Sequence, residues 1–161
     1  MSIANGGGVV VTGPAIAVAD VPTLPASKVP AADAITGAGE SLLFSKAGAN
    51  LNSTADQALT AIGTIPAKYQ VTKIVVANAS VSLGALLTAG GIYTAASKGG
   101  IAVVAATQLY TSLTGATLIL ELTIAAAGQA ALTAALLYFA LTTAAGSAAT
   151  ADIYVFGRPL P

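Results

Sequence analysis

Apolar and polar positions alternate in residues 117–124. Four aliphatic residues would share one face and mostly polar residues the other: Leu118, Leu120, Leu122 and Ile124 against Thr117, Ile119, Glu121 and Thr123. A strand sends successive side chains to opposite faces, whereas a helix would place Glu121 beside leucines. The pattern therefore predicts a strand around which the fold is built, with the Glu121 face turned to water or to a charged partner.

Short apolar segments recur between residues 58 and 157, and turn-forming residues such as glycine, proline and asparagine separate them. The predicted strands are residues 58–65, 69–79, 91–95, 101–105, 117–124, 135–142 and 152–157. Short strands at this spacing are typical of an all-β fold, here an antiparallel, jelly-roll-like β-sandwich. An alternative for residues 124–137 is a helix, because this stretch is rich in alanine, the strongest helix former.

Two of the predicted strands, residues 135–142 and 152–157, are apolar on both faces. In a two-layer antiparallel sandwich one face of each strand usually contacts water, so a second apolar face indicates a second partner. We expect this partner to be another subunit. The predicted oligomer interface consists of the aromatic and aliphatic side chains on those second faces: Leu136, Tyr138, Tyr154 and Phe156.

Residues 1–57 show no regular periodicity and contain a glycine triplet and four prolines from Pro14 to Pro30. Proline fixes φ and removes an amide donor, which favours extended backbone. A disordered tail is one interpretation. We favour an extended N-terminal arm that contacts neighbouring subunits or a capsid, with the sandwich domain at residues 58–161. The predicted contact residues of the arm are apolar: Val9, Val10, Val11, Ile16, Val18, Leu24, Val29, Leu42, Leu43 and Phe44. Residues 41–45 are either an anchor of the arm or a short strand.

The 161-residue chain is poor in charge, with 7% charged and 55% hydrophobic residues and a formal net charge of zero. Without a basic surplus it does not attract phosphate backbones, so no nucleic-acid partner is expected. A neutral, charge-poor monomer would also be poorly soluble, and burial between subunits removes that problem. The composition favours an obligate oligomer or one component of a larger assembly.

Membrane insertion is the alternative raised by the mean hydropathy of +0.83. Residues 122–145 carry no charge and are long enough to cross a bilayer, which takes about 20 apolar residues. However, no Lys or Arg flanks this segment, Gly128 and Gln129 interrupt it, and much of its hydropathy comes from alanine. We therefore do not expect a membrane partner. The first residues also lack the basic and apolar regions of a secretory signal.

Residue types for common catalytic and metal sites are scarce. The chain has no Cys and no His, which excludes thiol nucleophiles, histidine-based triads and the usual zinc sites. Ser97 and Lys98 could form a serine–lysine pair, but the two glycines that follow favour a hairpin turn. The acidic residues are scattered, with no pair typical of a glycosidase: Asp20, Asp33, Glu40, Asp56, Glu121 and Asp152. We expect no enzymatic activity, no cofactor and no metal.

The order of segments across residues 58–157 resembles the small virion structural proteins of tailed bacteriophages. The segments that carry the resemblance are residues 74–80, 91–96, 115–117, 137–142 and 152–157. The resemblance implies an Ala/Thr/Gly-rich β-sandwich that decorates heads or forms short fibres, typically as a trimer. It does not extend to residues 1–57.

From this resemblance we expect a non-enzymatic capsid decoration protein, located in the virion and assembled in the host cytoplasm. Its expected partners are itself, as a homotrimer, and the major capsid protein or another virion protein. The alternative is a tail-fibre or receptor-binding module whose loops contact host surface glycans. A small integral membrane protein is a third hypothesis, and a dominant helical circular dichroism spectrum in detergent would support it.

Overall fold

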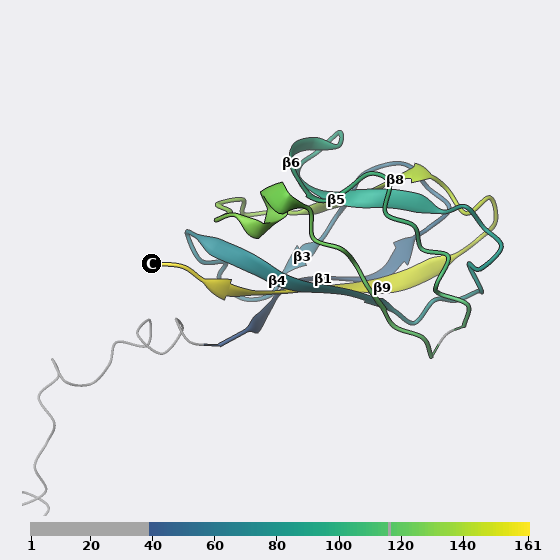
Figure 1. Ribbon diagram of the computed structural model, residues 1–161, viewed down its shortest axis with the longest axis horizontal. Coiled ribbons are helices and arrows are strands. Elements are labelled where there is room, and N and C mark those ends of the chain that lie inside the picture. The colour runs from purple at the N-terminus through teal and green to yellow at the C-terminus, as the bar shows by residue number, and fades with distance from the viewer. Residues whose placement is uncertain (1–38, 116) are drawn as a thin grey trace, which may run out of the picture. The chain divides into compact units, whose positions relative to one another are not determined.

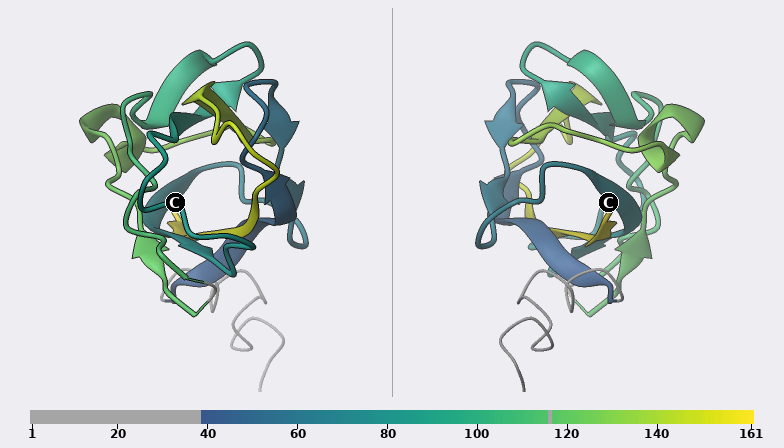
Figure 2. Two further views of the ribbon diagram at one scale, coloured as in Figure 1. Left: turned by 90° about the vertical axis from the view of Figure 1, so that its right-hand side faces the viewer. Right: turned by 90° about the vertical axis from the view of Figure 1, so that its left-hand side faces the viewer.

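The structure is a computed structural model that describes residues 39–115 and 117–161. In this part of the chain two antiparallel sheets form two layers (Figures 1 and 2), which confirms the predicted all-β sandwich. The strands are β1 (Ser41–Asn50), β2 (Gln57–Ala58), β3 (Thr60–Ala61), β4 (Tyr69–Ala77), β5 (Ala89–Ala95), β6 (Gly99–Val104), β7 (Leu120–Glu121), β8 (Tyr138–Thr143) and β9 (Thr150–Pro159).

One sheet has five strands in the order β3-β1-β9-β4-β7, and the other has four in the order β2-β8-β5-β6. The pairs β1–β9, β2–β8, β4–β7 and β5–β6 are nested, so that the chain folds like one long hairpin rolled into two layers. This is the jelly-roll arrangement, in which short edge strands leave little unpaired backbone. The longest strand ladders belong to β9, which pairs with β1 on one side and with β4 on the other.

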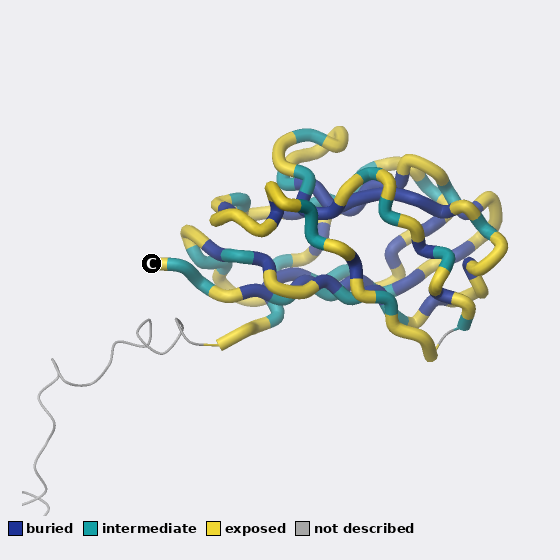
Figure 3. Tube along the Cα trace, viewed as in Figure 1, coloured by how far each residue is buried: buried dark blue, intermediate teal, exposed yellow. Residues whose placement is uncertain are grey.

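The core lies between the two sheets, where the inward side chains of alternate strand positions meet. Figure 3 shows where the buried residues fall along the Cα trace. It contains two aromatic pairs: Phe44 packs on Tyr69 with ring centroids 5.9 Å apart, and Tyr110 meets Phe139 edge to face at 5.9 Å. Such tilted and edge-on contacts are the favoured geometries of aromatic rings. The alternation of apolar residues therefore produces one continuous core from both sheets.

The predicted end of the arm at residue 57 is wrong, because β1 is an internal strand of the five-stranded sheet. Leu43 and Phe44 were predicted to contact another chain, but they are 4% and 0% exposed in the core of this one. The ladder of β1 with β9 supplies the hydrogen bonds that hold residues 41–50 in the sandwich. The other predicted arm contacts, from Val9 to Val29, lie outside the described residues.

Two predicted strands are wrong in detail, because the chain changes sheets within them. In residues 58–65, Gln57–Ala58 pairs with β8 and Thr60–Ala61 with β1, on opposite sides of the buried Leu59. In residues 117–124, only Leu120–Glu121 forms a strand, at the edge of the five-stranded sheet, and Ile124 already bridges to Val104 of the other sheet. Residues 117–124 therefore connect two sheet edges and do not form the centre of the fold.

The predicted faces of residues 117–124 hold only in part. Glu121 is exposed and Leu122 is 3% exposed, as the alternation indicates. The predicted burial of Leu118 is wrong: this side chain is 43% exposed, because it precedes the paired residues and lies in a loop.

In the alanine-rich residues 124–137, Ala126–Gln129 forms one turn of 3-10 helix, η3, and the rest is not helical. Among the described residues, the structure has no helix long and apolar enough to cross a membrane.

Candidate functional site on the outer face of the five-stranded sheet

Strand β9 alternates strictly between core and surface. Ile153, Val155 and Gly157 are buried between the sheets. Gly157 has to be a glycine here, since a Cβ would lie 2.5 Å from the Gln70 carbonyl oxygen and 2.6 Å from a methyl group of Leu43. The residues between them point outward, so the outer face of β9 presents, in chain order, Asp152, Tyr154, Phe156 and Arg158.

The neighbouring strands extend this outer face with further apolar side chains. Val75 of β4 pairs with Tyr154, and Leu42 of β1 pairs with Phe156. Cross-strand partners lie on the same face of a sheet, which brings residues from three strands together. Next to β4 this face contains an open groove of about 450 Å³. Its lining is mainly apolar, from Val75, Ala77, Ile119, Tyr154 and Phe156, together with Glu40 and Lys73.

The segment before β7 adds the most exposed part of this surface. Ile119 lines the groove and is 69% exposed, and the adjacent Leu118 is 43% exposed. Large aliphatic side chains with such exposure lose contact with water only when another molecule covers them. The groove together with Ile119 is the apolar part of the outer face.

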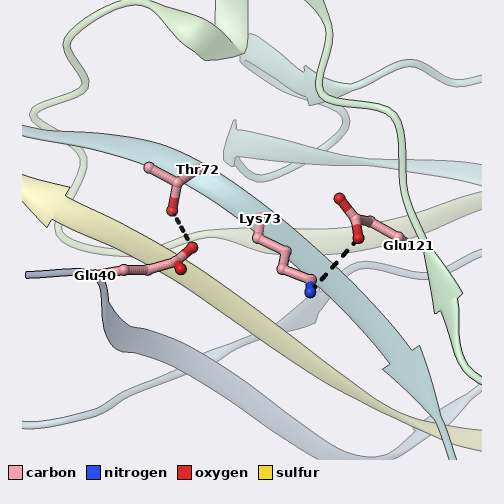
Figure 4. A network of polar contacts seen from close by, with 4 residues as sticks. All are labelled: Glu40, Thr72, Lys73 and Glu121. Carbon is pink, nitrogen blue, oxygen red and sulfur yellow. Dashed lines mark hydrogen bonds and ion pairs between the residues drawn. The ribbon is translucent and has the colours of Figure 1, made fainter.

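Two charged residues, Glu40 and Lys73, line the groove, and Figure 4 shows their polar contacts. The Nζ of Lys73 lies 3.6 Å from a carboxylate oxygen of Glu121, and the Oγ1 of Thr72 donates a 2.5 Å hydrogen bond to Glu40. The Lys73–Glu121 pair is exposed, so it contributes little to stability. An apolar centre with a polar rim is the usual composition of a protein–protein interface.

Asp152 and Arg158 stand at the two ends of the β9 face, and neutral groups hold both. Asp152 accepts hydrogen bonds of 2.8 Å from the Asn78 side chain and of 2.8 Å from the Gly48 backbone amide. These two hydrogen bonds lower the pKa of Asp152 below its ordinary value. The Nε and a terminal amino group of Arg158 donate to the Oε1 of Gln70 at 3.0 and 2.7 Å. Each end of the face therefore carries a positioned, ionised group.

A second, smaller groove of about 360 Å³ lies beside the start of β1. Leu42, Ile62 and two prolines supply its apolar walls, and Glu40 borders both grooves. Leu42 was predicted to contact another subunit or a capsid, and it is only partly buried at this position. Glu40, just before β1, is therefore shared by the two grooves.

The predicted interface residues separate into two groups. Tyr154 and Phe156 lie together on the outer face of β9. Tyr138 is the first residue of β8 in the other sheet, where it pairs with Tyr93 of β5, and Leu136 lies in the loop before β8 with 44% exposure. The predicted interface is thus two surfaces and not one.

Val75, Ala77 and Ile119 are not among the predicted interface residues, although they line the groove. A pattern in the sequence could have identified the first two. Residues 74–77 are apolar at every position, so this strand has a second apolar face by the same criterion that identifies β8 and β9. Ile119 has no comparable pattern, because only the course of the loop brings it to the groove.

The structure offers little for catalysis. Ser97 and Lys98 lie in the turn between β5 and β6 with positive φ angles of 59° and 55°, as expected for a hairpin turn. The Ser97 backbone amide donates to Asp56, and the Nζ of Lys98 donates to the Thr54 carbonyl oxygen at 3.3 Å. Among the described residues, no three acidic side chains lie close enough together to hold a metal ion.

Comparison of the chain with protein-family models, with curated proteins and with solved structures gave no match. The outer face of β9 and the jelly-roll architecture are therefore the features that bear on function.

Proposed function

We propose that this chain is a non-enzymatic structural protein of a bacteriophage virion. In this proposal it is a capsid decoration protein that forms trimers and reinforces the head lattice. The observation that carries it is the outer face of β9, where Tyr154 and Phe156 line an apolar groove in a chain with very few charges. Jelly rolls are common among viral capsid domains. The order of apolar segments in the sequence, which resembles that of small phage virion proteins, is the second support for the proposal.

Apolar burial would supply most of the association energy. Each Å² of apolar surface removed from water contributes about 25 cal/mol, and a stable interface buries on the order of 1,200–2,000 Å² in total. Two separate surfaces are available for such contacts, one around Tyr154 and Phe156 and one around Leu136 and Tyr138. A closed ring of three needs a contact between unlike surfaces, or other parts of the chain, because the same patch cannot pair with itself around a three-fold axis.

The attachment to the capsid is assigned in this proposal to residues 1–38, with Val9 to Val29 as the anchors. The test uses capsids of the encoding phage from which this protein has been deleted. The full chain should bind them and raise their resistance to heat, whereas a chain that begins at Gly39 should remain folded and fail to bind. This truncation keeps Glu40, whose carboxylate accepts the hydrogen bond from Thr72. Equal binding by both chains would contradict the assignment, and no binding by either would contradict a decoration function.

Recognition of host glycans by a tail-fibre or receptor-binding module is the second candidate function. The observation that favours it is the pair of partly exposed aromatic rings, Tyr154 and Phe156, in an open groove with a carboxylate at its border. Jelly rolls also include lectin domains. A glycan array and saccharide titration of the Tyr154 resonances distinguish the two functions. The decoration proposal expects no saturable binding.

A further inference from the structure

The outer face of β9 has an ordered sequence of chemical groups. An acid, two aromatic rings and a base follow one another as Asp152, Tyr154, Phe156 and Arg158. The six residue steps from Asp152 to Arg158 span about 20 Å along the strand, so the two charges lie far apart with the two rings between them. In the reverse direction, the order is base, aromatic, aromatic, acid. A copy of this strand turned by 180° therefore presents the complementary group at every position.

The two end charges are positioned but not neutralised within the chain. Among the described residues, Asp152 and Arg158 have only uncharged hydrogen-bond partners, namely Asn78, Gly48 and Tyr154 for the acid and Gln70 for the base. Lys73 and Glu121 differ, because they form an ion pair with each other on the same face. Glu40, which lines the groove, also has an uncharged partner in Thr72, so the charges left for an external partner are Glu40 and the two at the ends of β9.

We propose that a second copy of this chain docks on the outer face of β9 about a two-fold axis. The two β9 strands run antiparallel across the contact. Asp152 of each copy faces Arg158 of the other, and Tyr154 of each copy packs against Phe156 of the other. Sheets that pack face to face keep their strands within about 30° of alignment, which allows both ends to meet. Aromatic contacts at the centre of an interface with charges at its rim provide affinity and direction respectively.

The charges select the two-fold arrangement over the alternative. If the two β9 strands were parallel, Asp152 would face Asp152 and Arg158 would face Arg158, and like charges across an interface are strongly unfavourable. The antiparallel contact is isologous, since the same patch serves on both copies. A separate peptide or glycan would have to supply an acid and a base about 20 Å apart, which a second copy provides without further assumptions.

This inference deepens the proposed function, on which it rests only for the place of the contact in the particle. The β9 face joins copies in pairs, so the three-fold contact of the proposed trimer is left to the surface around Leu136 and Tyr138, which has to meet an unlike part of the next copy. Pairing through β9 would then link neighbouring trimers. The native mass should be an even multiple of the 15.5 kDa chain, whether the paired units are single chains or trimers.

Charge reversal tests the antiparallel pairing directly in the full-length protein. Arg158→Glu alone should place a second carboxylate against Asp152 of the other copy, weaken self-association about a hundredfold and halve the native mass measured by light scattering. Asp152→Lys alone should have the same effect. Mixing the two variants should restore the paired mass. In a mixed pair, both carboxylates of the Arg158→Glu copy face cationic side chains of the Asp152→Lys copy. Lys98→Glu, on the β5–β6 turn of the other sheet, is the matched control and should leave the mass unchanged.

A second measurement covers the case in which Asp152→Lys disturbs the fold. Phe156→Glu should halve the native mass while the circular dichroism spectrum stays that of a β-sandwich. Leu87→Glu, a change at a side chain that is 75% exposed elsewhere, should not alter the mass. An unchanged mass in folded Arg158→Glu and Phe156→Glu would overturn the inference. If folded Arg158→Glu and Asp152→Lys fail to pair when mixed, although Phe156→Glu dissociates, another occupant covers the face and the inference is also overturned. Capsid binding by the full chain is a separate readout, so failure of the decoration function is recognised independently.

Discussion

The side-chain amide of Asn78 donates a 2.8 Å hydrogen bond to the carboxylate of Asp152. Asn78 follows β4 with a positive φ of 54°, a conformation that costs energy for a residue with a side chain. The other carboxylate oxygen accepts from Gly48, which has a φ of 58° in the irregular part of the β1–β9 ladder. One carboxylate on β9 therefore fixes the backbone of both neighbouring strands.

The first prediction is that Asp152 makes the fold sensitive to acid. Its folded pKa is lowered, so its stabilisation is complete above the unfolded value of about 3.9 and is lost as pH falls through the folded pKa. Thermal melts of the wild type and Asp152→Asn from pH 7 to pH 2 measure this. The wild type should be the more stable at pH 7, and the difference should shrink below about pH 4. A difference that stays constant over the whole range would contradict the assignment.

The second prediction concerns the two faces of the segment that contains β7. Leu122 is 3% exposed in the core, so Leu122→Ala should lower the free energy of unfolding by about 2–5 kcal/mol. Glu121→Gln removes an exposed ion pair with Lys73 and should cost less than about 1 kcal/mol. Leu120→Ala should fall between them, because this side chain is only partly buried. Urea unfolding gives all three values, and a large loss for Glu121→Gln would show that the Glu121 face is covered.

The third prediction is a loss of stability in alkali. Burial raises the pKa of Tyr69 to about 12, and its hydroxyl donates a 2.8 Å hydrogen bond to the Ala134 carbonyl oxygen. The protonated form is favoured in the folded state, so stability is complete below the unfolded pKa of about 10 and is lost as pH rises from there towards 12. Burial also raises the pKa of Tyr110.

Tyr69→Phe should therefore reduce the dependence of unfolding on alkaline pH, and the double change with Tyr110→Phe should reduce it further. At pH 7, Tyr69→Phe should cost about 1 kcal/mol for the lost hydrogen bond. Urea unfolding between pH 7 and pH 12 measures both effects. An alkaline profile identical in the wild type and the double variant would show that these two phenols do not control it.

The fourth prediction tests the close approach at Gly157. A Cβ at this position would lie 2.5 Å from the Gln70 carbonyl oxygen, so Gly157→Ala should shift β9 and cost about 1–3 kcal/mol. Gly115→Ala is the control, because nothing lies within 4 Å of a Cβ there. The two variants are compared by their midpoints of thermal unfolding. Equal midpoints would mean that the β4–β9 ladder adjusts at no cost.

Much of the architecture follows from local patterns in the sequence. The alternation in residues 152–157 predicts both the buried Ile153 and Val155 and the outward Tyr154 and Phe156, and the structure agrees. The glycines after Lys98 predict the turn between β5 and β6. The arm boundary fails at residue 57, because β1 contains bulges opposite β9 and its burial pattern is therefore not strictly alternating. Irregular burial of this kind conceals a strand from any rule based on a period of two.

The class of the fold and the outward side chains of its last strand can be read from the residues alone. The lack of Cys and His likewise excludes, without any structure, thiol nucleophiles, histidine-based triads and the usual zinc sites. The folded chain was needed to show that β9 is central, that residues 117–124 lie at an edge, and that Val75 and Ile119 join Tyr154 in one groove. Alternation reports which side of a strand is apolar, and this is a local property of the backbone. The pairing of strands depends instead on the burial and hydrogen bonding of the whole chain, because those contacts join residues far apart in sequence.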